Sequence, residues 1–362
     1  MAYTTINKST DYFDTKLHNG NATAKTLAYD FEVDMFWTKM RNDAYPHNVY
    51  DSVRGADQQL RTNVSNSSRV AGNTVSFGNS SGVSLGTDSG NYGTNKTQTD
   101  GGSQATYVGW GWKAGGTGSS NTDGTITSTV SVNTTAGFSI VKYVGNTVAG
   151  ATVGHGLGAV PSVIMIKQTT GSTNWTVYHK GLGSHAKYLY LDASNGETTD
   201  SGNFDNVPTS STFLLGSNSG VNAASGSTYI AYCFAEKTGF SKFGKLISNG
   251  NDSGSFCYTG FAPKWVMLKP NVTDGWSNWY IFDTTRDHPQ LNDMPLYANL
   301  STQEGYYGGS PASNYAQIDL LSNGFKIRRD GNWGGGSSGR ELIYMAFGQS
   351  IVGSNNVPAT AR

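Results

Sequence analysis

Residues 258–287, YTGFAPKWVMLKPNVTDGWSNWYIFDTTRD, decide the fold because they have the pattern of two β-strands and a loop between them. The run 264–268 (KWVML), apolar after Lys264, follows a Gly-Phe-Ala-Pro turn, and the run 279–282 ends in a polar turn that carries Asp283 and Arg286. Aromatic and β-branched runs bounded by turn residues are typical of strands. We therefore expect a strand, a Gly/Asn/Asp loop and a second strand.

The same strand–loop–strand pattern occurs three times in the chain. Each first strand ends in a lysine, namely Lys39, Lys167 and Lys269. Three flanking blocks recur in the same order around each pair of strands: 12–17, 82–86 and 106–110, then 138–143, 212–216 and 228–232, then 240–245, 324–328 and 342–347. Five matched blocks in one order indicate an internal repeat.

The repeat has the length of a small domain. Its period of roughly 100 to 125 residues exceeds the 20–50 residues of solenoid and propeller units and suits a domain with its own core. We expect an all-β fold of three tandem antiparallel β-sandwich domains, jelly-roll-like, with little or no helix. The expected parts are a polar leader 1–10, copy one 11–112, a Gly/Ser/Thr-rich linker 113–136, copy two 137–236, copy three 239–348 and a polar tail 349–362.

The connections between the copies differ in length. Copies two and three are almost contiguous, so we expect them to be closely coupled and copy one to be freer. The first half of the linker 113–136 has the composition of a flexible segment. Its second half alternates Thr/Ser with Ile126, Val130 and Val132, which is compatible with an extended edge strand.

Composition excludes several classes of protein. Charged residues make up 14% of the 362 residues, against about 25% in ordinary domains. Aromatic residues make up 12%, enough to build cores rather than a disordered chain. The net charge is zero with no basic stripe, which argues against nucleic-acid binding. No apolar run is long enough to span a membrane, no heptad run predicts a coiled coil, and no cleaved secretion signal is expected.

Residues with catalytic or metal-binding chemistry are sparse. None of the six histidines recurs in all three copies, and no His or Cys spacing suggests zinc. No Gly-x-Ser-x-Gly nucleophile elbow is present. We expect no enzyme, with no catalytic, cofactor-binding or metal-binding residue and no cofactor. Cys233 and Cys257 are expected to be buried thiols rather than a disulfide.

Two acid–base pairs follow the second core strand at the same spacing, Asp51 with Arg54 and Asp283 with Arg286. They allow two interpretations: a catalytic acid with its electrostatic partner, or a turn in which Asp accepts backbone N–H bonds and Arg closes over it. In copy two both residues are replaced together, by His179 and Leu182. Joint replacement favours a structural turn pair, because losing one partner would leave a charge uncompensated.

Aromatic residues in Gly-rich loops are the candidate surface contacts, and they are Trp276, Tyr306, Tyr307 and Trp333. Exposed aromatics beside small polar residues supply contact area to saccharide sites and paratopes. The alternative is that they fold back onto their own domain or pack at a subunit interface.

The blocks 261–269 (FAPKWVMLK), 50–55 (YDSVRG), 82–86 (GVSLG) and 106–110 (TYVGW) resemble a repeat domain of marine bacteriophage virion proteins. Cyanophage-like structural and tail-fibre proteins are the group concerned, and the resemblance covers nearly all of 11–348. Copy one departs from the pattern with Val33 in place of proline, and copy two lacks the Asp and Arg of the turn.

This resemblance implies a location, the virion, more than an activity. Our first hypothesis is a virion structural protein exposed on the particle, as a tail or fibre component or a head decoration, that takes part in host attachment. The second is a receptor-recognition module that binds host surface glycan, and the third, ranked below these, is a polysaccharide depolymerase. The expected partners are other virion proteins and further copies of the chain, with a homotrimer favoured. The expected location is the virion surface, after synthesis in the host cytoplasm and release by lysis.

Overall fold

Each of the three copies forms a main antiparallel sheet, and the order of its five central strands is the same each time. The computed structural model describes residues 4–90, 92–223, 226–287, 289, 292–307, 310–311, 317–328 and 338–352. The order is β1 (Phe13–Asn19), β9 (Thr106–Trp112), β3 (Met35–Met40), β4 (Asn48–Asp51) and β5 (Gln58–Arg61) in copy one; β12 (Phe138–Val144), β19 (Thr228–Phe234), β14 (Val163–Gln168), β15 (Thr176–His179) and β16 (Lys187–Tyr190) in copy two; and β20 (Ser241–Ile247), β29 (Glu341–Gln349), β22 (Ala262–Pro270), β23 (Tyr280–Asp283) and β24 (Leu296–Tyr297) in copy three.

A small sheet covers one face of each main sheet. These sheets are β2 (Lys25–Ala28), β8 (Gly82–Leu85) and β7 (Val75–Ser76); β13 (Ala151–Gly154) and β18 (Thr212–Leu215); and β21 (Phe256–Tyr258), β28 (Gly324–Arg328) and β27 (Gln317–Leu321). The described helices are short: η1 (Ser9–Asp11), η2 (Lys180–Leu182) and α1 (Ser219–Asn222). The prediction of an all-β, antiparallel, sandwich-like fold with little helix is confirmed.

Short strands extend the edges of these sheets. β6 (Arg69–Val70) follows β5 in copy one, and β17 (Thr198–Thr199) follows β16 in copy two. In copy three, β25 (Tyr306–Tyr307) and β26 (Ser310–Pro311) form a separate two-stranded sheet. The cysteines Cys233 and Cys257 are buried and free, as expected.

The first core strand of each copy is buried on both faces because its alternate side chains enter two different cores. In β3, Phe36 packs into the core of copy one beneath the small sheet, whereas Trp37 packs into a core shared by all three copies. Successive side chains of a strand point to opposite faces. A continuous apolar run is therefore required here.

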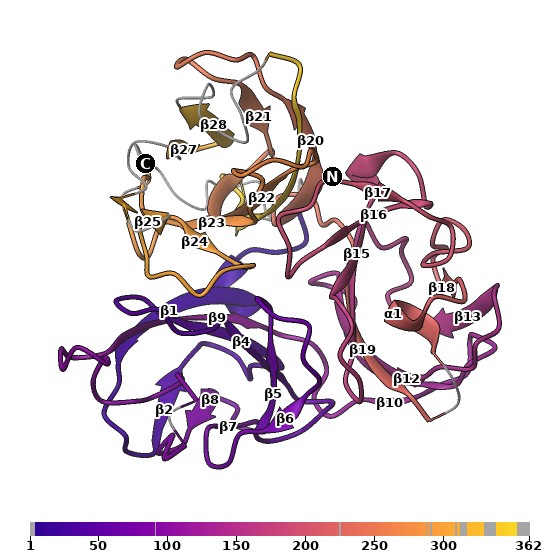
Figure 1. The fold of residues 1–362 in the computed structure, drawn as a ribbon, viewed down its shortest axis with the longest axis horizontal. Coiled ribbons are helices and arrows are strands. Elements are labelled where there is room, and N and C mark those ends of the chain that lie inside the picture. The colour runs from indigo at the N-terminus through magenta and orange to yellow at the C-terminus, as the bar shows by residue number, and fades with distance from the viewer. Residues whose placement is uncertain are drawn as a thin grey trace.

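The shared core lies where the three main sheets face one another (Figure 1). Three equivalent residues of the closing strands β9, β19 and β29 meet there: Trp112, Phe234 and Phe347. Their ring centroids lie 6.5 Å apart for Trp112–Phe234, 5.8 Å for Phe234–Phe347 and 5.9 Å for Trp112–Phe347. This aromatic triangle marks an approximate threefold axis inside a single chain.

The shared core corrects the expectation that copy one is freer than the others. Burial of Trp37, Trp110 and Trp112 against side chains of copies two and three ties copy one to both. In the linker, β11 (Ser128–Asn133) pairs with β12, so the second half forms a strand as expected. The first half differs from the prediction, because β10 (Ser119–Asn121) pairs with β11 and becomes the edge of the copy-two sheet. Ile126 and Val130 of the second half are buried in the core of copy two, and β10 of the first half is held by its pairing with β11.

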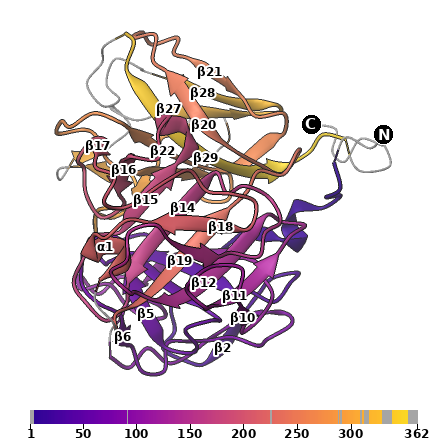
Figure 2. The ribbon, with the colours of Figure 1, turned by 90° about the vertical axis from the view of Figure 1, so that its right-hand side faces the viewer.

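The leader is not a loose polar segment either. Ile6 is buried in the shared core, and the backbone N–H of Ser9 donates to Gln349 Oε1 at 2.7 Å. The first and last described residues therefore lie on the same side of the molecule (Figure 2). Of the predicted tail, residues 353–362 lie outside the described part of the chain. Within the described part, no helix is long and apolar enough to cross a membrane.

Candidate functional site

The turns after the second core strands form three equivalent junctions between copies. In copy one, Asp51 Oδ1 accepts the backbone N–H of Arg54 at 2.8 Å, and Oδ2 accepts the Arg54 guanidinium at 2.5 Å. The Tyr232 hydroxyl of copy two donates to the same Oδ2 at 2.7 Å. The Asp–Arg pair thus shapes a turn and also holds the neighbouring copy.

The junction between copies three and one has the same geometry. Asp283 Oδ2 accepts the guanidinium of Arg286 at 2.5 Å and the indole N–H of Trp110 at 3.1 Å. Arg286 also donates to Glu304 Oε1 at 2.8 Å, and its side chain is fully buried. Burial opposes the charge of Arg286, but the carboxylates of Asp283 and Glu304 outweigh it and raise the pKa of the guanidinium.

The junction between copies two and three uses a histidine instead. His179 Nδ1 accepts the backbone N–H of Gly181 at 3.0 Å, so Nε2 carries the proton and donates to the Tyr344 carbonyl at 3.0 Å. Burial lowers the pKa of His179 to about 4, with Lys180 adding to the shift, which keeps the ring neutral. The residue that corresponds to Trp110 and Tyr232 is Met345, which has no donor for a carboxylate.

The three junctions form a closed ring, from copy one to two, two to three and three to one. The copy-two turn has neither Asp nor Arg. The position that holds the donors Trp110 and Tyr232 in the other two junctions is Met345 in this one. Sequence comparison of the copies shows that Met345 differs, but it does not show that its strand β29 meets His179, which bonds to the Tyr344 carbonyl. Which residues of two different copies meet at a junction is visible only in the structure.

The three repeated lysines are buried and anchor the loops that follow the first core strands. Lys269 Nζ donates to the carbonyl oxygens of Pro270 at 2.9 Å, Ser277 at 2.8 Å and, from copy two, Ser194 at 3.2 Å. Lys39 and Lys167 likewise donate to carbonyls of the loops that follow them, those of Asp43 and Gly171. Burial lowers the pKa of Lys269 and of Lys39 to about 7, and that of Lys167 to about 8.

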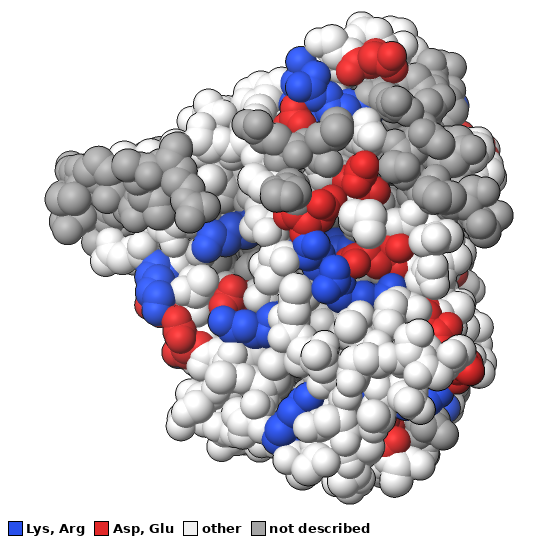
Figure 3. Space-filling view, turned by 90° about the vertical axis from the view of Figure 1, so that its left-hand side faces the viewer, with Lys and Arg blue, Asp and Glu red and all other residues white. Residues whose placement is uncertain are grey.

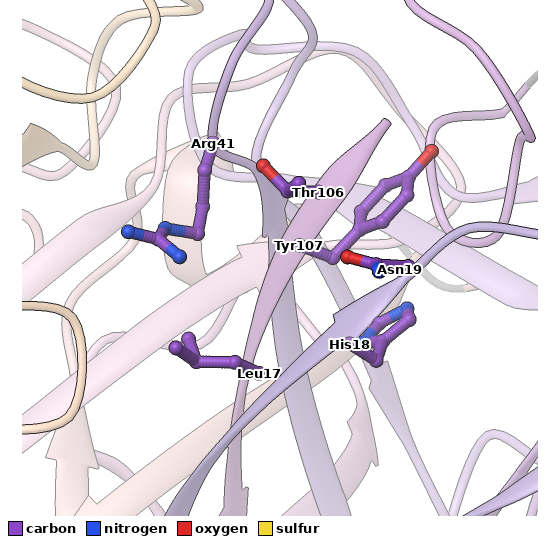
Figure 4. Close-up of a pocket in the computed structure, with 6 residues that line it drawn as sticks. All are labelled: Leu17, His18, Asn19, Arg41, Thr106 and Tyr107. Atoms are coloured by element: carbon purple, nitrogen blue, oxygen red, sulfur yellow. The ribbon is translucent and has the colours of Figure 1, made fainter. Parts of the chain in front are cut away.

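A cavity of about 310 Å³ lies at the end of the copy-one sheet (Figure 4) and is lined by Leu17, His18, Asn19, Arg41, Thr106 and Tyr107. Arg41 is held in an ion pair with Glu304 of copy three, with its Nη2 2.7 Å from Oε2. The charge of Arg41 is therefore already matched by Glu304. Charged side chains of both signs also gather toward the middle of the molecular face shown in Figure 3.

His18 is held in the wall of this cavity by Tyr107 and the Thr94 carbonyl. Its ring stacks on Tyr107 with centroids 4.9 Å apart, and Nε2 lies 3.2 Å from the Thr94 carbonyl. Burial lowers the pKa of His18 to about 4, and Lys25 adds to the shift. Among the described residues, no group of three His, Cys, Asp or Glu side chains could hold a metal ion.

The predicted surface aromatics occupy different parts of copy three. Trp276 is half-buried in the loop between β22 and β23, where its backbone N–H donates to Asp274 Oδ1 at 2.8 Å. Tyr306 lies in β25 and is 37% exposed. Tyr307 lies in the same strand, but its side chain is outside the described part of the chain, as is the whole of Trp333.

Comparison with known proteins gives one match. The model of a family described as a domain of unknown function, DUF7483, matches residues 8–350 and so spans all three copies. No curated protein and no solved structure matches the chain.

Proposed function

Because the chain belongs to the DUF7483 family, a domain of unknown function, we propose its role from its own residues: it is a structural protein exposed on a bacteriophage particle. In this role it is a tail or fibre component or a head decoration and takes part in host attachment. The observation that carries the proposal is the closed ring of buried junctions around one aromatic core. Such a ring makes a rigid block from one chain, which suits a load-bearing part of a particle.

Two further features support a structural role. The repeated blocks resemble those of marine phage virion proteins, and the pairs of ionisable residues at the junctions are already engaged in holding copies together. Burial of a paired charge favours a defined arrangement over a mobile one. The interaction with other virion proteins, the homotrimer and the location at the virion surface are parts of the same proposal.

The test is to locate the chain in particles made by host cells that carry its gene. Gradient-purified particles are analysed by mass spectrometry and by immunogold labelling with antibody against the purified protein. A soluble lysis enzyme from the same cells serves as the control for carry-over. We expect the chain to co-purify with particles and to be labelled on their surface. Recovery only in the soluble fraction would refute the proposal.

The attachment role has its own measurement. Purified chain added before infection should reduce particle adsorption if it occupies the receptor, and mass measurement in solution should detect the homotrimer. The depolymerase alternative predicts the release of reducing ends from host polysaccharide, which a structural protein would not cause.

A further inference from the structure

A second cavity, of about 290 Å³, opens at one end of copy two between the edge of the main sheet and the α1 segment. The nine residues that line it include no charged side chain, and the ones used below are Thr173, Asn174, Thr176, Tyr190, Asn203 and Asn218. Its volume is close to the lower bound of about 300 Å³ for small-molecule sites. The lining combines hydroxyls, amides and one aromatic ring.

Polar atoms in this lining are buried without a partner. Thr176 is 1% exposed, and its Oγ1 makes no hydrogen bond; the Oγ1 of Thr173 is buried and unbonded as well. The Asn203 amide lies beside the Tyr188 hydroxyl, whose pKa is raised chiefly by burial. Buried polar atoms cost free energy unless a partner meets them. The cavity therefore presents hydrogen-bonding groups that a ligand can use.

The other two copies fill the equivalent space with their own residues. The strand register aligns Thr176 with Tyr280 in copy three and with Asn48 in copy one. The Tyr280 ring is 3% exposed and packs edge-on against Tyr297 at 5.1 Å. Asn48 Nδ2 instead donates to the Tyr92 carbonyl at 3.0 Å, which closes a loop over the site.

Copy two has a short threonine at this position, and Tyr190 takes the place of Tyr297. The cavity is thus the space that an aromatic ring occupies in copy three, with a tyrosine still beside it. A ligand ring of similar size would restore the contact.

We propose that this cavity binds one sugar unit of a neutral glycan. A sugar ring offers an apolar C–H face for the tyrosine and hydroxyls that both donate to and accept from Thr173 and Thr176. The amides of Asn174 and Asn218 are held by Asp192 at 3.1 Å and Asp200 at 2.8 Å, so acidic groups lie behind the lining. These carboxylates disfavour an anionic sugar. The inference stands apart from the virion role, and either can fail without the other.

The test uses the full chain and saturation-transfer NMR with glucose, galactose, mannose and N-acetylglucosamine, with sialic acid as the anionic comparison. The first variant is Thr176→Tyr, which introduces the copy-three residue and fills the cavity. The matched control is Thr127→Tyr, which adds the same ring at an exposed linker position before β11, outside the lining of the cavity. We expect at least one neutral sugar to bind, Thr176→Tyr to abolish binding and Thr127→Tyr to leave it unchanged.

A second variant tests the same site with a smaller change, in case Thr176→Tyr fails to fold. Thr176→Val keeps the shape of the side chain and removes one hydroxyl, so the affinity should fall by roughly two- to tenfold, the effect of one hydrogen bond. Three results would each overturn the proposal: no neutral sugar binds the wild-type chain, sialic acid alone binds, or Thr176→Tyr binds as tightly as the wild type.

Discussion

Replacing Arg54 with leucine, the residue that copy two carries at this position, should destabilise the chain more than replacing Arg54 and Asp51 together. The side chains of Arg54 and Asp51 are 4% and 0% exposed. In Arg54→Leu the Asp51 carboxylate keeps its bonds to the Arg54 backbone N–H and the Tyr232 hydroxyl but loses its counter-charge. Breaking a buried ion pair by removing one partner costs about 3–5 kcal/mol.

The double variant Asp51→His with Arg54→Leu introduces the neutral pair of copy two. The histidine Nδ1 can accept a backbone N–H, as His179 does, and its Nε2–H can donate to the Tyr232 hydroxyl oxygen. The variant loses the bond from the guanidinium to the Val49 carbonyl at 3.1 Å and two longer ones, to the Ser68 hydroxyl at 3.3 Å and the Tyr232 hydroxyl at 3.4 Å. We expect a cost of about 1–2 kcal/mol. The double variant should thus be the more stable of the two by roughly 2 kcal/mol.

Urea unfolding followed by tryptophan fluorescence measures both free energies, and unchanged m-values would show that the denatured states are comparable. The matched control is Lys245→Leu, which removes one partner of the exposed pair with Glu341 and should cost about 0–1 kcal/mol. The reasoning fails if Arg54→Leu costs no more than this control, or if the double variant is as unstable as the single one.

Three more expectations concern the other junctions, the lysines and the core. The double change Asp283→His with Arg286→Leu should lower the free energy of unfolding more than its counterpart in copy one, because the Trp110 N–H can only donate and would meet the N–H of the new histidine. Adding Trp110→Met should recover stability in urea unfolding, and no recovery would contradict the ring of junctions. The pKa of Lys269 is about 7 in the folded chain, against an ordinary value of 10.5. Between these pH values the unfolded chain binds more protons, so the free energy of unfolding rises with pH. The rise from pH 7 to 9 should be smaller in Lys269→Met, and equal slopes would show that Lys269 does not cause it. Phe347→Ala should lower the free energy of unfolding by about 3–5 kcal/mol. Its unfolding should still be a single transition by fluorescence and circular dichroism, whereas separate transitions would mean that the copies unfold independently.

The strands of each copy were predictable because local patterns encode them. The run at 264–268 is β-branched and aromatic, and β22 contains it; the repeats then indicated a common strand order, which the three sheets have. The shared core was not predictable. Alternation in β3 shows that both Phe36 and Trp37 must be covered, but not that Trp37 is covered by other copies.

The site residues show the same limit. Loss of Asp and Arg together in copy two indicated a turn pair, since both replacements are visible in the aligned copies. The cavity left a weaker signal, namely the change from Tyr280 to Thr176 at aligned positions. A short residue in place of a tyrosine leaves a cavity only if nothing else moves in, and sequence does not reveal that. In the segment 113–136, the alternation around Val130 and Val132 indicated the strand β11, whereas abundant Gly and Ser obscured β10.

The triangle of Trp112, Phe234 and Phe347 has a consequence for valency. Three identical subunits around an axis must carry any pocket three times or not at all, and they separate on dilution. Three covalently joined copies keep their arrangement at any concentration, and each can change alone. One copy can hold an open cavity while its two neighbours are closed by Tyr280 and by Asn48. Such a molecule would bind once, from one direction, on a scaffold whose three main sheets share one strand order.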